Sequence, residues 1–355
     1  MAYSSARPGW ILWQNPRIMT TPAIRTWVLL AAVAAVVASF VSYPTLPRAA
    51  SAESPDSGAS AASGDSSQPA ETAPAAAAPP PALEDGTPIL GWAIRELERH
   101  RAVSLEMRHL VEIDGITMTG QGIYKQDQLP KMRLEWHTSL DPAEPRAVVM
   151  QVCDGQSLLE WRDIRGSQRI QKIDVATVLK ALAAEQGKRP PNAPGIPFLG
   201  LGGLPQLLRT LDVDLTFVRL ADLPGDPPLL RIVGTWKPEA LARIVPKPKN
   251  GSTRVPRLAD VPPTAPTHVE LTIDSRNACP RTLRWLHAPK ASLDGVLDAN
   301  PLVLATLEFF GEVYDEPQRA DAFVYEPPKN AVVEDVTKAY LQRLGLAAPE
   351  TPAKK

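Results

Sequence analysis

The sequence predicts an α+β fold that is mainly antiparallel: an incomplete β-barrel of about ten to eleven strands, with helices covering its concave face. Two patterns predict this fold. Apolar and polar residues alternate with period two in segment after segment between Val103 and Tyr314. A few segments have helical periodicity instead, and some of them interrupt the series of strands. One large β fold commonly reaches the length of residues 87–346, so this stretch is predicted to be a single domain.

The N-terminal residues 1–52 are predicted to direct export, as a signal peptide or as a membrane anchor. Residues Thr26–Tyr43 are apolar and uncharged, and Arg7, Arg17 and Arg25 precede them. This charge distribution keeps the start of the chain in the cytoplasm and sends the rest across the membrane. Cleavage at Ala50–Ala52 and retention as a single-span anchor both remain open. The domain is therefore expected in the periplasm or on the outer side of the cytoplasmic membrane.

Two segments are too polar and too rich in small residues to form a core. Residues 53–86 contain mainly Ala, Pro, Ser and Gly, and are predicted to be a disordered linker. Residues 347–355 are predicted to be a disordered tail. The formal net charge of −1 argues against a nucleic-acid partner, because nucleic-acid binding favours a basic face.

The first half of the domain is predicted to be a helix followed by a meander of strands. The helix is Pro88–Arg101, where Ile89, Ala93 and Leu97 share one face. Asp114-Gly115 and Asp154-Gly155 are typical hairpin turns. The predicted strands are Val103–Ile113, Ile116–Gln126, Lys131–Leu140, Arg146–Cys153 and Leu158–Ile164. The basic residues Arg162, Arg165, Arg169 and Lys172 are predicted to belong to a solvated loop, with contact to anionic headgroups as the alternative.

The second half begins where Asp174 is a plausible N-cap for a helix over Val175–Gln186. A loop, Lys188–Gly203, leads into a short helix at Pro205–Leu211. Further helices are predicted at Pro238–Val245 and Val333–Leu344, separated by the loop Pro246–Pro266 and by more strands. These strands are Asp214–Leu220, Leu229–Trp236, His268–Asp274, Pro280–His287 and Leu302–Tyr314.

Four short motifs, in this order, carry a resemblance to a known family. They are Gln151-Val152-Cys153-Asp154-Gly155, Gly202-Gly203-Leu204-Pro205, Gly234-Thr235-Trp236-Lys237-Pro238, and Phe323-Val324-Tyr325 with its following prolines and helix. The chain resembles the LolA/LolB-like superfamily of periplasmic lipoprotein-binding proteins, in an uncharacterised exported branch. The resemblance implies a half-barrel whose helices close over a greasy cavity. It also implies a carrier of lipid or lipoprotein acyl chains, or a module that contacts a partner protein in envelope signalling.

Six residues on the apolar sides of predicted strands are the candidates for lining that cavity. Aromatic and aliphatic side chains there offer apolar surface to an acyl chain, although filling an ordinary core is the alternative for each. The candidates are Leu134, Trp136, Trp161, Trp236, Leu283 and Trp285.

The sequence offers no catalytic or metal-binding motif, so an enzyme is not expected and no cofactor or metal is predicted. It contains no G-x-S-x-G motif, and its five histidines lack metal-ligand spacing. His109 and His137 are predicted to face water. Cys153 and Cys279 either form one bridge or are two separate buried thiols. The sequence therefore predicts a non-enzymatic protein that binds a hydrophobic ligand and reaches the membrane through its N-terminal segment.

Overall fold

The computed structural model describes residues 84–113, 116–127, 130–139, 147–164, 166–184, 202–245, 254–288 and 300–346. The predicted export segment, most of the predicted linker and the predicted tail lie outside these residues. Among the helices within these ranges, none combines the length and the apolar character that a membrane crossing requires.

The described strands form one open, twelve-stranded sheet in the order β12-β6-β5-β4-β3-β2-β1-β11-β10-β9-β8-β7. Every pair is antiparallel except β12 with β6. Since β12 and β7 do not pair with each other, the barrel stays incomplete, as predicted. The strands are β1 Ala102–Ile113, β2 Ile116–Asp127, β3 Lys131–Ser139, β4 Ala147–Cys153, β5 Ser157–Ile164, β6 Ser167–Asp174, β7 Leu215–Leu223, β8 Leu229–Trp236, β9 His268–Asp274, β10 Pro280–His287, β11 Leu302–Tyr314 and β12 Val333–Asp335.

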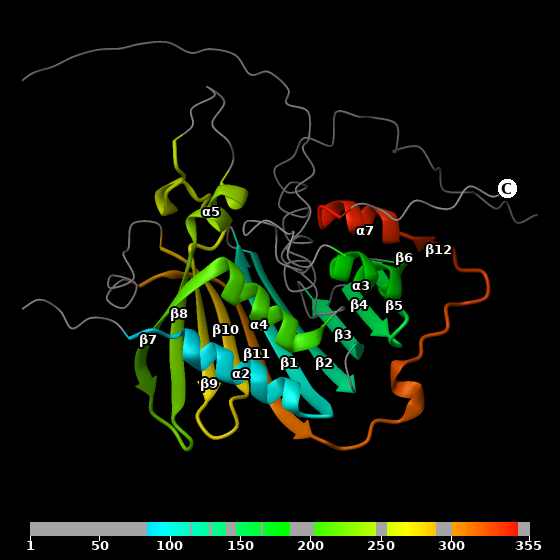
Figure 1. Ribbon diagram of the computed structural model, residues 1–355, viewed down its shortest axis with the longest axis horizontal. Coiled ribbons are helices and arrows are strands. Elements are labelled where there is room, and N and C mark those ends of the chain that lie inside the picture. Colours follow the sequence, from blue (N-terminus) through cyan, green and yellow to red (C-terminus); the bar gives the residue numbers. More distant parts are fainter. Residues whose placement is uncertain are drawn as a thin grey trace, which may run out of the picture.

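Helices cover one face of this sheet, which we call the concave face (Figure 1). Helices α2 (Thr87–Arg99) and α4 (Gly203–Asp214) lie side by side across the strands at one end. Helices α3 (Val175–Ala184) and α7 (Thr337–Arg343) lie over β5 and β6 at the other end. The remaining helical turns are α5 (Pro238–Ile244), η3 (Leu258–Asp260) and η4 (Ala320–Phe323).

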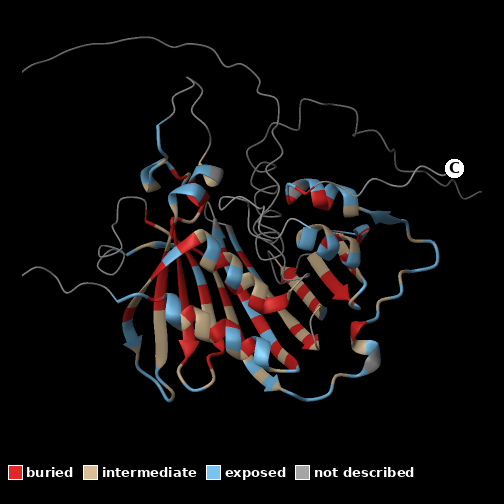
Figure 2. Ribbon diagram, in the orientation of Figure 1, coloured by how far each residue is buried: buried red, intermediate tan, exposed pale blue. Residues whose placement is uncertain are grey.

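The main core lies between the concave face and these helices. Helix α2 buries Leu90, Ala93, Ile94 and Leu97, whose 3–4 residue spacing places them on the side facing the sheet (Figure 2). They join one apolar cluster that extends to the residues of α3 and α7 facing the sheet. Burial of this face, rather than helix propensity, is what stabilises helices of this length.

Two segments differ from the sequence prediction. The segment after Gly166, predicted as a solvated loop, is strand β6, which carries Arg169 and Lys172. Its only buried apolar residues are Ile170 and Ile173, so its alternation is too weak to recognise. The start of the last predicted helix, Val333–Asp335, is strand β12, which pairs in parallel with β6. A three-residue parallel strand depends on a distant partner, and local sequence does not reveal that partner.

Candidate functional site

Five of the six predicted cavity residues lie together on the concave face. Leu134 and Trp136 come from β3, Trp236 from β8, and Leu283 and Trp285 from β10. Each is at most 7% exposed, and all belong to the main core cluster. The strands therefore direct these side chains to one sheltered apolar layer, in which other side chains pack against them.

Trp161 is the sixth candidate, and its predicted position is wrong. In β5, Leu158 is opposite Cys153 and Glu160 is opposite Gln151, so these residues share the concave face with Leu134. Trp161 points to the other, convex face, where it is half-buried and opposite Ile170. The sequence misled because the residues of β5 on the concave face are partly polar and those on the convex face partly apolar.

His109 was predicted to face water, and this prediction is also wrong. The side chain is 3% exposed and points to the concave face, as do Leu105, Met107 and Val111 at alternate positions of β1. Its ring stacks on Trp136, with centroids 4.6 Å apart and planes 3° from parallel. Burial lowers the pKa of His109 to about 4, so the imidazole is neutral at pH 7. The period-two series from Val103 to Val111 was the signal that could have placed it.

The neighbouring strand makes room for this ring pair. Gly120 of β2 lies opposite His109, and Gly122 lies opposite Trp136. A Cβ atom at Gly120 would overlap the His109 ring, and one at Gly122 would overlap Trp136. We call His109, Trp136, Gly120 and Gly122 the ring recess. It is a place where two flat side chains lie directly on the backbone of the sheet.

Beside the ring recess, β4 and β5 place a buried polar group on the same face. Gln151 Nε2 donates to Glu160 Oε2 over 2.6 Å, and Arg162 Nε lies 2.5 Å from Glu160 Oε1. Gln151 is 0% exposed and Glu160 is 5% exposed. We call these three residues the polar cluster. Its ion pair neutralises its own charges, as burial requires.

Helix α4 is attached to the sheet at its first residues. The Leu204 amide donates to Tyr124 Oη over 2.9 Å, and Tyr124 Oη donates to Gln126 Oε1 over 2.5 Å. Gly203 has φ +63°, and a Cβ there would overlap Tyr124 Oη. The Gly-Gly-Leu-Pro motif therefore permits a helix start that sits directly on a buried tyrosine of β2.

The cysteines are the two separate buried thiols, and the bridge is not formed. Cys153 ends β4, while Cys279 precedes β10, and β3, β2, β1 and β11 lie between these strands. At about 4.8 Å per strand, the backbones are too far apart for a disulfide. Burial raises the pKa of each thiol to about 11, so both are protonated at pH 7.

The convex face has a groove of about 580 Å³ between β1–β3 and the segment that follows β11. Its walls include Lys125, Arg133, Glu135 and Arg319. Arg133 pairs with Glu135 and donates from Nη1 to the Ala322 carbonyl of η4 over 3.2 Å. This groove has charged walls, whereas the concave face is largely apolar apart from the polar cluster. Within the described ranges, no three His, Cys, Asp or Glu side chains are grouped to hold a metal ion.

No family model matches the sequence, and no curated protein matches it. Similar solved structures include MucB in complex with MucA(peri), at 11% identity and a TM-score of 0.32 over 68% of this chain and 60% of that one. A DUF1329 family protein from Desulfovibrio piger is 8% identical, with a TM-score of 0.30 over 68% of this chain and 98% of that one. A LolA superfamily protein from Nitrosomonas europaea is 9% identical, with a TM-score of 0.27 over 68% and 98%.

The match covers less than two thirds of the MucB chain, namely 60% in the complex. The solved structures that are similar to this chain thus include a protein of the LolA superfamily. The four sequence motifs of this chain resemble the same superfamily.

Proposed function

We propose that this protein is an exported, non-enzymatic binding protein that holds a hydrophobic ligand between the concave face and its helices. The ligand is a lipid or the acyl chain of a lipoprotein. The observation that carries the proposal is that a largely apolar face of an open sheet is covered by helices, not by a second sheet. Separating such helices from the sheet breaks side-chain packing and leaves the backbone ladder of the sheet intact.

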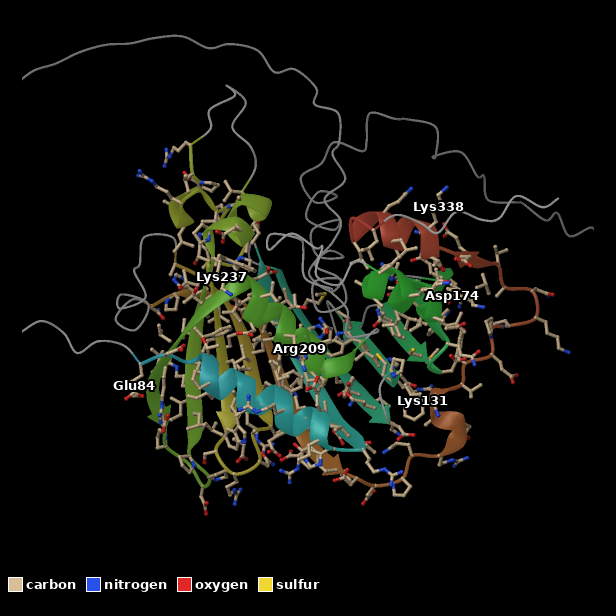
Figure 3. The ribbon with its side chains drawn as sticks, in the orientation of Figure 1. Glu84, Lys131, Asp174, Arg209, Lys237 and Lys338 are labelled. Atoms are coloured by element: carbon tan, nitrogen blue, oxygen red, sulfur yellow. The ribbon has the colours of Figure 1, made fainter. Side chains whose placement is uncertain are left out.

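Polar contacts add to the apolar packing of the helical layer. Arg209 of α4, labelled in Figure 3, donates to both carboxylate oxygens of Glu98 on α2. His100, at the end of α2, lies 2.9 Å from Asp315 through its Nδ1 atom. The Arg209–Glu98 ion pair joins α4 to α2 and does not involve the sheet. The His100 contact, in contrast, ties α2 to the end of β11. Moving the two helices off the sheet as one unit would break the His100 contact, the Leu204–Tyr124 hydrogen bond and the apolar packing.

An acyl chain would supply the free energy for this exchange. Leu90, Ile94 and Leu97 of α2 fill the layer that a ligand would occupy, and their contacts with the sheet are lost when it enters. Each buried methylene contributes about 0.8 kcal/mol, so a long chain can offset the loss of several leucine contacts. The domain, residues 87–346, would then carry its ligand on the side sheltered by α2 and α4.

The first experiment is mass spectrometry of organic extracts from natively purified protein, together with titration of a fluorescent fatty acid. We expect a co-purifying lipid and saturable uptake of the probe. Trp136→Phe should weaken uptake about fivefold through lost apolar contact, whereas the matched variant Trp161→Phe, on the convex face, should bind as the wild type does. Absence of any lipid together with absence of uptake would overturn the proposal.

A second candidate function is an envelope interaction or sensor module that uses the same fold to bind a partner protein. Two observations favour it: the cavity candidates are closely packed, and the convex face offers a charged groove. A photo-crosslinker at Lys125 in the groove should then capture one defined protein, while the same group at exposed Lys180 on α3 should not. Sequencing the mature N-terminus separates the candidates further, because a retained anchor favours the module.

A further inference from the structure

We propose that His109 recognises an uncharged hydroxyl group of the bound amphiphile, with Trp136 as the platform for the adjoining chain. The inference rests on the proposed function and specifies its ligand class: an acyl chain joined to a neutral, hydroxyl-bearing headgroup such as glycerol. It is carried by the ring recess, where a buried polar side chain has no hydrogen-bond partner among the described residues and where two glycines of β2 leave room for the two rings themselves.

The imidazole of His109 is buried without compensation. Neither Nδ1 nor Nε2 has a hydrogen-bond partner among the described residues. His268, which is equally buried, differs because its Nδ1 lies 2.9 Å from the Thr267 hydroxyl. A buried polar group without a partner costs free energy, so an unpaired imidazole in a core calls for an explanation. A ligand that bonds to the ring would recover that cost on binding.

Two glycines at alternate positions of β2 shape the recess in which the His109 and Trp136 rings lie. Gly120 and Gly122 have ordinary negative φ angles, so the backbone conformation does not require glycine at either place. Glycine inside a strand weakens it and marks a site where a ligand or another backbone approaches closely. Here the missing side chains are what let His109 and Trp136 lie flat across β2.

The surroundings select an uncharged ligand group that both donates and accepts. A neutral imidazole has one N–H donor and one nitrogen acceptor, and a hydroxyl can bond to either. A charged headgroup would lack a free counter-charge, because Arg162 and Glu160 already pair with each other. Gln151 Oε1 in the polar cluster is a second buried acceptor without a partner among the described residues. Gln151 lies three strands from β1 and level with Leu105 rather than with His109, so the hydroxyl is assigned to His109 alone.

The experiment compares two uncharged ligands with the same acyl chain, monooleoylglycerol and methyl oleate, as competitors of a fluorescent acyl probe on the full chain. We expect the wild type to prefer monooleoylglycerol about tenfold, the effect of one or two hydrogen bonds. His109→Phe keeps an aromatic ring and should lose that preference while still binding methyl oleate. His109→Gln, which still donates and accepts, should retain part of it.

The controls separate this inference from the proposed function. His137→Phe, on the opposite face of β3, should leave the preference unchanged. Equal wild-type affinity for both ligands, or a preference that survives in His109→Phe, would overturn the inference while the proposed function stands. Failure of the wild type to bind the probe or either ligand would overturn both. Should circular dichroism show that His109→Phe is unfolded, the ¹⁵N shifts of the His109 ring in the wild type provide the second test: they should move with monooleoylglycerol and not with methyl oleate, and equal shifts with both ligands would count as contradiction.

Discussion

The two ends of the concave face differ in what lies beneath their helices. Under α2 and α4, the residues of β8 to β11 that face the helices are apolar, with Leu271, Leu283 and Leu307 fully buried. Towards α3, strands β4 and β5 place the polar cluster on the same face. The ring recess lies between the two, on β1 to β3. One sheet thus has an apolar end and an end where a buried polar cluster lies among apolar residues.

This contrast distinguishes burial that stabilises the fold from burial that costs free energy. Apolar burial is non-directional, so the apolar end stabilises the fold without selecting a ligand. Buried polar groups cost free energy unless all their hydrogen bonds are made. The polar cluster and His109 therefore lower the stability of the fold wherever a donor or acceptor lacks a partner. The predictions below measure how strongly each side contributes.

The largest effect is expected at the apolar end. Leu283 is 0% exposed, so Leu283→Ala should lower the free energy of unfolding by about 2–5 kcal/mol through lost transfer energy and the cavity left behind. Urea denaturation measures it. The control is Leu110→Ala, because Leu110 is 39% exposed on β1 and its loss should cost less than about 0.5 kcal/mol. Equal losses in the two variants would contradict the account.

Acidification should have the next largest effect. Burial lowers the pKa of both His109 and His268 from 6.5 to about 4, so the unfolded chain takes up these protons first as the pH falls. Their contribution to stability is complete above pH 6.5 and is lost towards pH 4, on the order of 3 kcal/mol for each histidine. Denaturation at pH 7 and pH 5 tests this. His109→Phe should reduce the difference, and an unchanged difference would show that His109 is not the buried group described here.

Within the polar cluster, a smaller loss is expected. Glu160→Ala leaves Gln151 Nε2 and the Arg162 guanidinium without their partner, which should cost about 2 kcal/mol. The comparison is Asp321→Ala, which breaks the Arg319 ion pair on the surface, where the side chains are 85% and 66% exposed. That change should cost less than about 0.5 kcal/mol, and similar losses in both variants would mean that the cluster is open to water.

The smallest effect concerns the attachment of α4. Tyr124→Phe removes the hydroxyl that accepts from the Leu204 amide, at a cost of about 1 kcal/mol. Hydrogen exchange should rise at Leu204 and the next residues of α4, while α7 at the other end keeps its protection. If exchange in α4 does not change, then the helix is held by packing alone.

The sequence predicted the strands that have strong alternation and clear ends. Leu229–Trp236, His268–Asp274, Pro280–His287 and Leu302–Tyr314 agree with β8 to β11 at both ends. Each of these strands combines alternating apolar residues with turns or prolines at its ends, so the local sequence is sufficient to predict where it begins and ends. Strand β6 lacked such a pattern, and β12 exists only through its pairing with β6.

The candidate site was harder to predict, because alternation separates two faces without saying which one the helices cover. Trp161 and Ile170 are apolar and pair with each other, yet they lie on the convex face. The choice between faces follows from cross-strand register, as when Glu160 pairs with Gln151. Register is a non-local property, and it also brings His109 onto Trp136 across β2. The five candidates that lie on the concave face came from strands whose two faces differ strongly in polarity.

Quenching of tryptophan fluorescence by a brominated fatty acid tests most directly where a ligand binds. Bromine quenches only the tryptophans close to it, and Trp136 and Trp161 lie on opposite faces of the sheet. The account predicts saturable quenching that falls clearly in Trp136→Phe and stays unchanged in Trp161→Phe. Quenching that persists in Trp136→Phe and falls in Trp161→Phe would place the ligand on the convex face and contradict the account.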